Sequence, residues 1–124
     1  MLKLMFCLRR LPHLSVEEFQ DYWYNQHGPL VRSVADVLNI RRYVQSHTLA
    51  DPRLGSTADA RACVVLPYDG VAELWFDDVA SILASGRTEE GRAAGLLLLE
   101  DERKFIDLPQ SPLYFVRERV IVGD

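Results

Sequence analysis

The chain has 124 residues, of which 48% are hydrophobic and 26% are charged, and its formal net charge is −4. This length and composition are typical of one soluble domain, so we expect residues 1–124 to form a single globular unit. The acidic balance argues against a nucleic-acid partner and against an anionic membrane surface, because both would favour a basic excess. Two cysteines far apart in the chain, Cys7 and Cys63, indicate reduced thiols and a cytoplasmic location.

No segment has the pattern of a signal peptide or of a membrane span. Arg9 and Arg10 interrupt the apolar start of the chain, and no small-residue cleavage site follows them. The longest later apolar run, around Leu96–Leu99, is much too short to cross a bilayer. We therefore expect a protein without membrane contact.

The hydrophobic pattern predicts the element order βαββαβ. Apolar residues alternate from Leu2 to Leu8, which indicates a first strand with one apolar face, and Ser15 with Glu18 forms a capping box that begins the first helix. Gly28-Pro29 is expected to stop that helix. Strands are expected over residues 2–9, 40–49, 71–76 and 113–122, helices over residues 15–28, 30–38, 78–85 and 88–106, and a loop over residues 50–60.

Four strands with helices on one face give an α+β, ferredoxin-like fold built on an antiparallel sheet. The other face of the sheet is left uncovered, and it would expose an apolar patch carrying Tyr43, Val71, Trp75 or Val116. Two such sheets packed face to face would remove the patch from water. The pattern therefore predicts a homodimer of the dimeric α+β barrel type.

His27 is the first candidate for chemistry, because it lies in the last turn of the first predicted helix. It shares a helical stripe with Phe19 and Trp23. The helix C-terminus favours the imidazolium and burial opposes it, so one interpretation is a pKa near neutrality that suits a general acid or base. The alternative is structural: His27 caps helix carbonyls beside a core tryptophan, and a single histidine without a visible partner is a weak catalytic signal.

The stretch around His27 resembles a family motif. Phe19, Tyr22, Trp23 and His27 to Leu30, spaced F-x-x-Y-W-x-x-x-H-G-P-L, are similar to the signature of the EthD family within the dimeric α+β barrel superfamily. Residues 69–76 resemble the third strand of that family, residues 101–107 its late helix end, and residues 111–113 the entry to its last strand. The resemblance covers nearly the whole chain, and residues 50–66 are the stretch that it does not place.

The resemblance implies a dimeric barrel that acts on a small organic compound, but it does not imply one reaction. The family name comes from a small protein needed to degrade an alkyl ether beside a cytochrome system. Related barrels act as isomerases, cofactor-independent monooxygenases, cyclases and decarboxylases. The resemblance maps His27 onto the family histidine as the catalytic group, and Tyr22 and Trp23 onto the aromatic pair of the site.

Two further pairs are candidates for substrate binding. Tyr43 and His47 share a strand face that would line the barrel cavity; alternatively Tyr43 packs in the core and His47 is solvated near the strand end. Glu73 and Trp75 share a face of the third strand, where a buried carboxyl group would be a useful acid. The alternative for Glu73 is an ion pair with an arginine such as Arg42, Arg117 or Arg119.

The sequence carries no nucleotide-binding loop, zinc motif or nucleophile elbow, so we expect no metal and no bound cofactor. A metal held by His27, His47 and Glu73 is a disfavoured alternative. Haem ligation by one histidine, which occurs elsewhere in the superfamily, stays open. The acidic run Glu100-Asp101-Glu102 is expected to be a solvated helix face.

These observations favour an enzyme that binds a small apolar or aromatic compound between helices and sheet and moves a proton at His27. Its reaction would be an isomerisation, a decarboxylation or an oxidation without a bound organic cofactor. One alternative is a non-catalytic dimer that binds a ligand or assists an oxygenase system. Another is a structural dimer with a filled interior.

Overall fold

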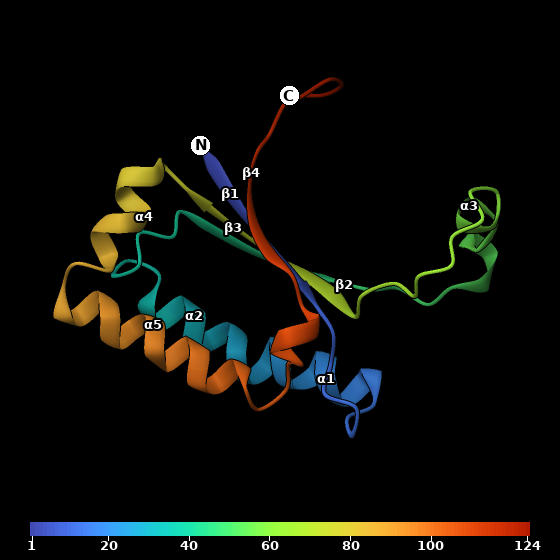
Figure 1. Ribbon diagram of the computed structural model, residues 1–124, viewed down its shortest axis with the longest axis horizontal. Helices are drawn as coiled ribbons and strands as arrows, with labels where there is room; N and C mark the ends of the chain where they lie inside the picture. Colours follow the sequence, from blue (N-terminus) through green and yellow to red (C-terminus); the bar gives the residue numbers. More distant parts are fainter.

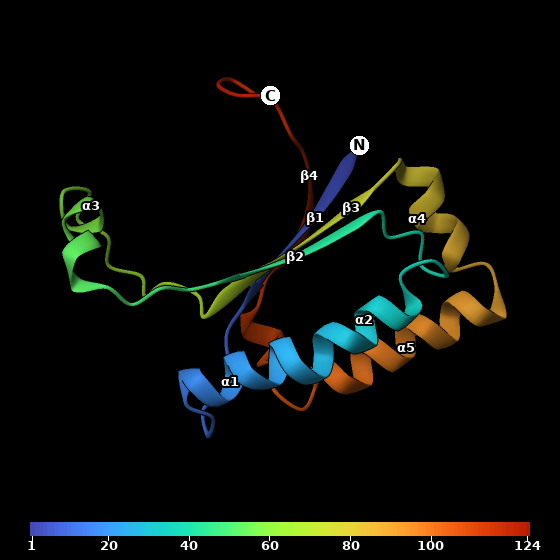
Figure 2. The same cartoon turned by 180° about the vertical axis from the view of Figure 1, so that it is seen from behind.

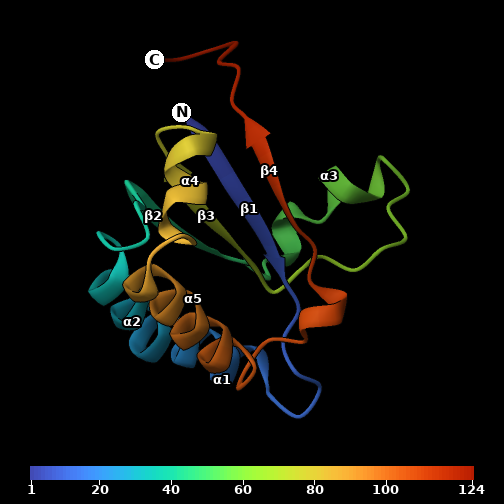
Figure 3. The same ribbon diagram turned by 60° about the vertical axis from the view of Figure 1, so that its left-hand side comes forward.

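Four strands and their covering helices make up the fold in the computed structural model, which describes all 124 residues. Strands β1 (Leu2–Leu8), β2 (Arg42–His47), β3 (Gly70–Phe76) and β4 (Leu113–Arg117) form one antiparallel sheet of order β2-β3-β1-β4. The helical elements are α1 (Val16–Tyr22), η1 (Trp23–His27), α2 (Gly28–Val34), η2 (Pro52–Leu54), α3 (Ser56–Asp59), α4 (Val79–Ser85), α5 (Glu89–Glu102) and η3 (Leu108–Gln110). Because α1, η1, α2, α4 and α5 lie on one side of the sheet (Figures 1 and 3), the predicted α+β ferredoxin-like fold is confirmed.

Two apolar clusters join the sheet to the helices. The first contains Phe6, Leu8, Phe19, Trp23, Ala72, Phe105 and Ile106. The second contains Val31, Ile40, Phe76 and Leu98. Tyr43 packs against both clusters. Phe19, Trp23 and Phe105 are fully buried, so η1 is anchored in the most tightly enclosed part of the domain.

Side chains just before the helices fix where the helices start. The Ser15 hydroxyl accepts the backbone N–H of Glu18 at 3.0 Å, and the Glu18 carboxylate accepts the backbone N–H of Ser15 at 2.9 Å. This is the predicted capping box. Asp78 forms a similar reciprocal box with Ser81 at the start of α4, and the Thr88 hydroxyl accepts the Gly91 N–H at the start of α5. None of the helices combines the length and the hydropathy that a membrane span requires.

Two elements end earlier than the sequence predicts. α5 ends at Glu102 rather than near Ile106, because the N–H groups of Lys104 and Phe105 bond to carbonyls only three residues back in a tighter turn. β4 ends at Arg117 rather than at Val122. Arg117 pairs with Leu2 at the start of β1, so the residues that follow it have no neighbouring strand to bond with.

The first helix does not stop at Gly28-Pro29, contrary to the prediction. α1 continues through η1 into α2 as one run, which is visible in Figure 2. The Gly28 N–H donates to the carbonyl oxygen of Trp23, five residues earlier, so this turn is a π turn. Pro29 lacks an N–H and its ring crowds the preceding turn of a regular α-helix. The wider π turn gives the ring room, and the helix is not broken.

The register of the sheet separates its two faces. Val71, Trp75 and Val116 lie on the uncovered face, as predicted, because alternate residues of paired strands share one side. The prediction is wrong for Tyr43, which pairs with Leu74 and lies on the helix-covered face. Burying the phenol against both apolar clusters is the more favourable arrangement for this side chain.

The segment between β2 and β3 leaves the body of the domain (Figures 1 and 2). The sequence predicts a loop over residues 50–60, and the structure shows η2 and α3 there. We refer to residues 49–67 as the arm. Every residue of the arm except Asp51 is exposed.

Gly70 at the start of β3 is predicted to be intolerant of a side chain. A Cβ atom at this position would lie 2.4 Å from the ring of Trp23 and 3.0 Å from the carbonyl oxygen of Ser46. We expect Gly70→Ala to lower the free energy of unfolding by about 1–3 kcal/mol, measured by urea denaturation. The control is Gly95→Ala in α5, where a Cβ meets no atom within 4 Å and stability should rise by up to about 1 kcal/mol. Equal stability of the two variants would contradict the expected clash.

Candidate functional site

His27 closes the π turn at a point where the helical run faces α5. The whole residue is 5% exposed, and its ring centroid lies 5.1 Å from that of Phe105. The carbonyl of Trp23 at the start of the turn accepts the Gly28 N–H. π turns of this kind are frequent at functional sites, because they reorient side chains within a helix.

An aspartate of α5 holds the His27 ring. Asp101 Oδ2 lies 2.7 Å from His27 Nδ1, and Asp101 Oδ1 accepts the Tyr22 hydroxyl at 2.6 Å. Lys104 Nζ lies 3.5 Å from the same Oδ1. The Asp101 side chain is 11% exposed, so these bonds form largely out of bulk water. Tyr22, His27 and Asp101 thus link α1, η1 and α5 at one point.

The surroundings determine which of these groups carries a proton. Burial lowers the pKa of the His27 imidazole, and the opposing effect of Asp101 is smaller. Burial raises the pKa of Asp101, but the hydrogen bonds from Tyr22 and His27 outweigh it, so this pKa lies below its ordinary value. Burial first, and then Asp101, raise the pKa of Tyr22 to about 12. At neutral pH, Asp101 is therefore an anion that accepts the Nδ1–H of a neutral His27.

The second ring nitrogen of His27, Nε2, is free to exchange a proton with a bound molecule. Nε2 has no hydrogen-bond partner in the chain, whereas Nδ1 is bound to Asp101. The protein contains no fully buried side-chain nitrogen or oxygen without a partner, so Nε2 must touch accessible space. With Nδ1 protonated, Nε2 carries a free lone pair and can act as a base.

Glu102 is a second unusual carboxyl group, next to Asp101 on α5. Burial, and then the negative charge of Asp101, raise the pKa of Glu102 to about 7. Burial also raises the pKa of Tyr43 on β2, and the charge of Glu102 adds to that effect. The Glu102 carboxyl group is thus within electrostatic reach of β2. It is about half protonated at neutral pH and can either donate or accept a proton.

A groove of about 910 Å³ opens between the helical run and β2. Two predicted binding residues, Tyr43 and His47, line it together with Gln45 from the same strand. The helical side contributes Tyr24, Asn25 and Gly28 among others. His27, Tyr22 and Trp23 are not among the lining residues, although Gly28 directly follows His27. The predicted site is therefore divided between the groove and the interior.

A row of polar groups runs along the β2 side of the groove. The Gln45 amide donates to the Trp23 carbonyl oxygen at 2.8 Å and to the Tyr43 hydroxyl at 2.9 Å. Its oxygen lies 2.8 Å from His47 Nε2 and can only accept, so Nε2 of His47 is protonated. The His47 ring stacks on Trp23 with ring centroids 4.5 Å apart. Burial lowers the pKa of His47, so its neutral ring keeps Nδ1 as an acceptor.

The structure does not bring Glu73 and Trp75 to His27. Both lie on the uncovered face of the sheet, because every second residue of β3 points away from the helices. Glu73 pairs with Lys3 at 3.2 Å rather than with one of the predicted arginines. The Trp75 indole N–H donates to Glu118 at 2.6 Å. These two residues belong to a separate polar and aromatic cluster.

Metal-ligating side chains are dispersed in this fold. His27 and His47 lie on the helix-covered side of the sheet and Glu73 on the other, so the trio considered from the sequence does not assemble. No group of three or more His, Cys, Asp or Glu side chains is arranged to hold a metal ion. The two cysteines are free, with Cys7 buried and Cys63 exposed.

The prediction of a solvated acidic face at the end of α5 is wrong for Asp101 and Glu102. Only Glu100 of this run is exposed. Asp101 falls on the buried stripe of Ala94, Leu98 and Phe105, whose members are spaced three or four residues apart. A charged residue on an otherwise apolar stripe is the signal that would have identified it.

Comparisons with known proteins agree with this architecture. Residues 11–109 match the EthD domain. The chain is similar to a solved EthD family protein from Bacillus halodurans, with 24% identity, a TM-score of 0.62, and coverage of 96% of this chain and 99% of that one. It is also similar to an EthD-like protein from Ralstonia eutropha, with 15% identity, a TM-score of 0.62, and coverage of 99% of this chain and 94% of that one. A dimeric protein of unknown function with a ferredoxin-like fold from Bacteroides fragilis is similar as well, with 11% identity, a TM-score of 0.59, and coverage of 94% of this chain and 95% of that one. No curated protein matches the sequence.

Glu102 is predicted to make stability depend on pH. Its folded-state pKa of about 7 lies above the ordinary value of 4.5, so its contribution is present below pH 4.5 and is lost as the pH rises through 7. Relative to wild type, Glu102→Gln should therefore gain about 3 kcal/mol of unfolding free energy between pH 4.5 and 8. Urea denaturation at several pH values measures this difference.

The matched control is Glu100→Gln, because Glu100 lies on the same helical turn but is exposed and pairs with Arg103 at 3.0 Å. A constant stability difference between wild type and Glu102→Gln across this pH range would contradict the prediction.

Proposed function

The chain belongs to the EthD domain family, and on that premise we propose that it is an enzyme that moves a proton on a small apolar or aromatic organic compound. His27 is the proposed general base. The observation that carries the proposal is the buried imidazole whose Nδ1 is bound to Asp101 while Nε2 has no partner. A neutral imidazole oriented by a carboxylate is an effective proton acceptor at neutral pH.

The simplest reaction for this arrangement is an isomerisation. Nε2 of His27 takes a proton from the α carbon of a β,γ-unsaturated carbonyl compound, and the electron pair of the broken C–H bond moves to the carbonyl oxygen as a dienolate that can accept a proton at its γ carbon. The Asp101 carboxylate stabilises the imidazolium that forms. Return of the proton to a different carbon restores neutral His27. Decarboxylation and cofactor-free oxidation are the other proposed reactions, since each also includes a proton transfer.

The proposed binding surface is the groove between the helical run and β2. Tyr43 and His47 offer aromatic faces to a small ligand, and Gln45 fixes both through its amide group. Trp23 supports the groove from behind, because His47 stacks on its ring. Tyr22 is proposed as a positioning residue, since its hydroxyl is bound to Asp101.

We also propose that the protein works as a homodimer through the uncovered sheet faces. This face carries Val71, Trp75 and Val116, none of which the helices cover. The similar protein from Bacteroides fragilis is described as dimeric, and it shares the ferredoxin-like fold. Packing two such faces together buries apolar area that a single subunit leaves in water.

One observation favours the alternative of a binding or accessory protein. The groove is large and open, and its lining does not include the His27 side chain. A ligand held only by Tyr43, Gln45 and His47 would be bound without contact to the proposed base. Such a protein would carry a compound or present it to an oxygenase system.

The enzyme proposal predicts exchange of carbon-bound hydrogen. We expect wild type to incorporate deuterium from D₂O into members of a panel of small aromatic ketones and lactones, followed by mass spectrometry. His27→Gln should lower the exchange rate by about 100-fold or more, because the base is lost. His13→Gln changes an exposed histidine and serves as the control. Ligand binding by the wild type without any exchange would support the accessory function instead.

The hydrogen-bonded pair of His27 and Asp101, the dyad, predicts a distinct result for Asp101→Asn. The amide cannot stabilise the imidazolium, so the exchange rate should fall by about 100-fold or more while ligand affinity changes little. In the wild type, the acid limb of the rate–pH profile should lie below 6.5, because burial lowers the pKa of His27 from that value. An acid limb above 6.5, or full activity of Asp101→Asn, would contradict the role of the dyad.

A further inference from the structure

The arm, residues 49–67, exposes apolar side chains that its own subunit does not bury. Val64, Val65 and Leu66 are consecutive and are 72–92% exposed. Leu49 and Leu54 in the same segment are also exposed. Figures 1 and 2 show the arm projecting clear of the sheet and of every helix layer. Contiguous exposed apolar residues on a soluble domain mark an interaction surface.

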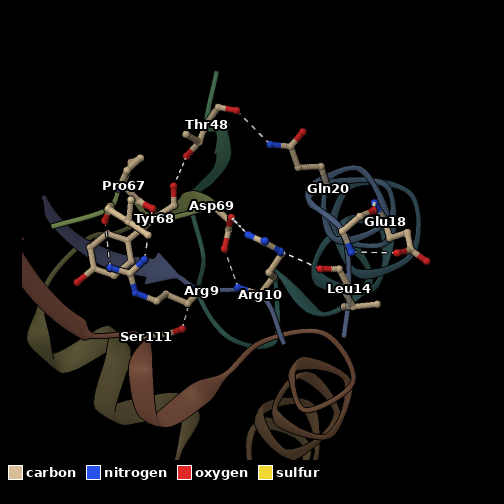
Figure 4. Close-up of polar contacts among 12 residues, drawn as sticks. Arg9, Arg10, Leu14, Glu18, Gln20, Thr48, Pro67, Tyr68, Asp69 and Ser111 are labelled. Carbon is tan, nitrogen blue, oxygen red and sulfur yellow. Dashed lines mark hydrogen bonds and ion pairs between the residues drawn. The ribbon is translucent and has the colours of Figure 1, made fainter. Parts of the chain in front are cut away.

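The base of the arm is fixed by a dense set of polar contacts, drawn in Figure 4. Asp69 accepts the Arg10 guanidinium at 2.7 Å and the Arg10 backbone N–H at 2.8 Å. The Thr48 hydroxyl donates to the Tyr68 carbonyl oxygen, which joins the two ends of the arm. The Arg9 guanidinium lies 4.3 Å from the Tyr68 ring centroid and donates to carbonyl oxygens of the last arm residues.

This base sets the direction in which the arm leaves the domain before any partner is present. A preformed arm loses less conformational entropy on association than a flexible loop would. The exposed apolar residues are thus held in a position where a partner surface can meet them. That combination is difficult to explain for a segment that serves only to connect β2 with β3.

The charges of the arm favour an apolar partner surface. Asp51 and Asp59 balance Arg53 and Arg61, so the arm is formally neutral. Asp51 and Arg53 also pair with each other at 2.6 Å. A neutral arm has no electrostatic attraction to nucleic acid or to an anionic bilayer. It also avoids repulsion by a second copy of this chain, whose net charge is −4.

The body of the domain carries a surface that fits such an arm. β4 is an edge strand, and its Leu113 and Phe115, which share the helix-covered side of the sheet, are 50% and 48% exposed. We infer that the arm of one subunit packs against β4 of a second copy of this chain. This inference rests on the proposed homodimer and adds a second contact to the sheet-to-sheet interface. The two-fold symmetry of a dimer would form the contact twice.

The test compares the dimer affinity of point variants by sedimentation velocity over a range of protein concentrations. Wild type should sediment as a dimer of the 14.2 kDa chain. The double variant Val64→Asp/Val65→Asp should weaken the dimer by at least about tenfold, because two charges would enter an apolar contact. Thr57→Asp, also exposed on the arm, is the matched control and should leave the dimer unchanged. Phe115→Asp should reproduce the defect from the receiving side.

A variant that lacks most of the arm separates loss of the contact from loss of the fold. Residues 49–66 are replaced by Asn-Gly, which the bond between Thr48 and Tyr68 should allow to close as a short turn. This variant should keep a cooperative thermal unfolding transition like that of the wild-type domain and lose dimer affinity as the double variant does. A dimer of wild-type affinity in all three variants would overturn the inference and leave the sheet-to-sheet dimer standing. A monomeric wild type would overturn both the arm contact and the proposed sheet-to-sheet dimer.

Discussion

The hydrogen bond between His27 and Asp101 is the interaction on which the candidate site depends. Together with the bond from Tyr22 to the same carboxyl group, it joins the helical run to α5. These two elements are distant in sequence and also pack through apolar side chains. A bond of this kind is valuable only where water is excluded, and the surrounding rings of Phe105 and Tyr22 provide that environment. It also fixes the tautomer, so the same contact that stabilises the domain decides which nitrogen can act as a base. Stability and chemistry are therefore linked through one carboxylate.

The π turn and the tight packing around Trp23 give the site its second constraint. Trp23 contributes its ring as a platform for His47, while its carbonyl oxygen accepts the N–H of Gly28 and the amide of Gln45. The π turn that carries His27 and the β2 side of the groove are consequently both attached to Trp23. A change in the position of this residue would alter both places together. The bare Cα of Gly70 beneath the ring shows how little space is available for such a change.

The fold could be predicted from the sequence because its signals are local. Alternation in β1, the capping box at Ser15 and the cap at Asp78 depend on residues that are close in the chain, and the structure confirms them. The site was only partly predictable, since it depends on contacts between elements. The motif indicates His27, but its partner Asp101 lies on another helix and belongs to a run that looks solvated in one dimension. Glu73 and Trp75 show the same dependence on tertiary structure, because sharing a strand face with each other does not tell which layer that face meets.

The two neighbouring carboxyl groups at the end of α5 respond to acid at very different points. Glu102 takes up a proton near pH 7, whereas the pKa of Asp101 lies below its ordinary value. As the medium becomes mildly acidic, Glu102 therefore loses its negative charge while Asp101 keeps its own, and the repulsion between the two neighbouring carboxylates disappears. The carboxylate that orients the imidazole is still charged at a pH where the residue beside it has become neutral.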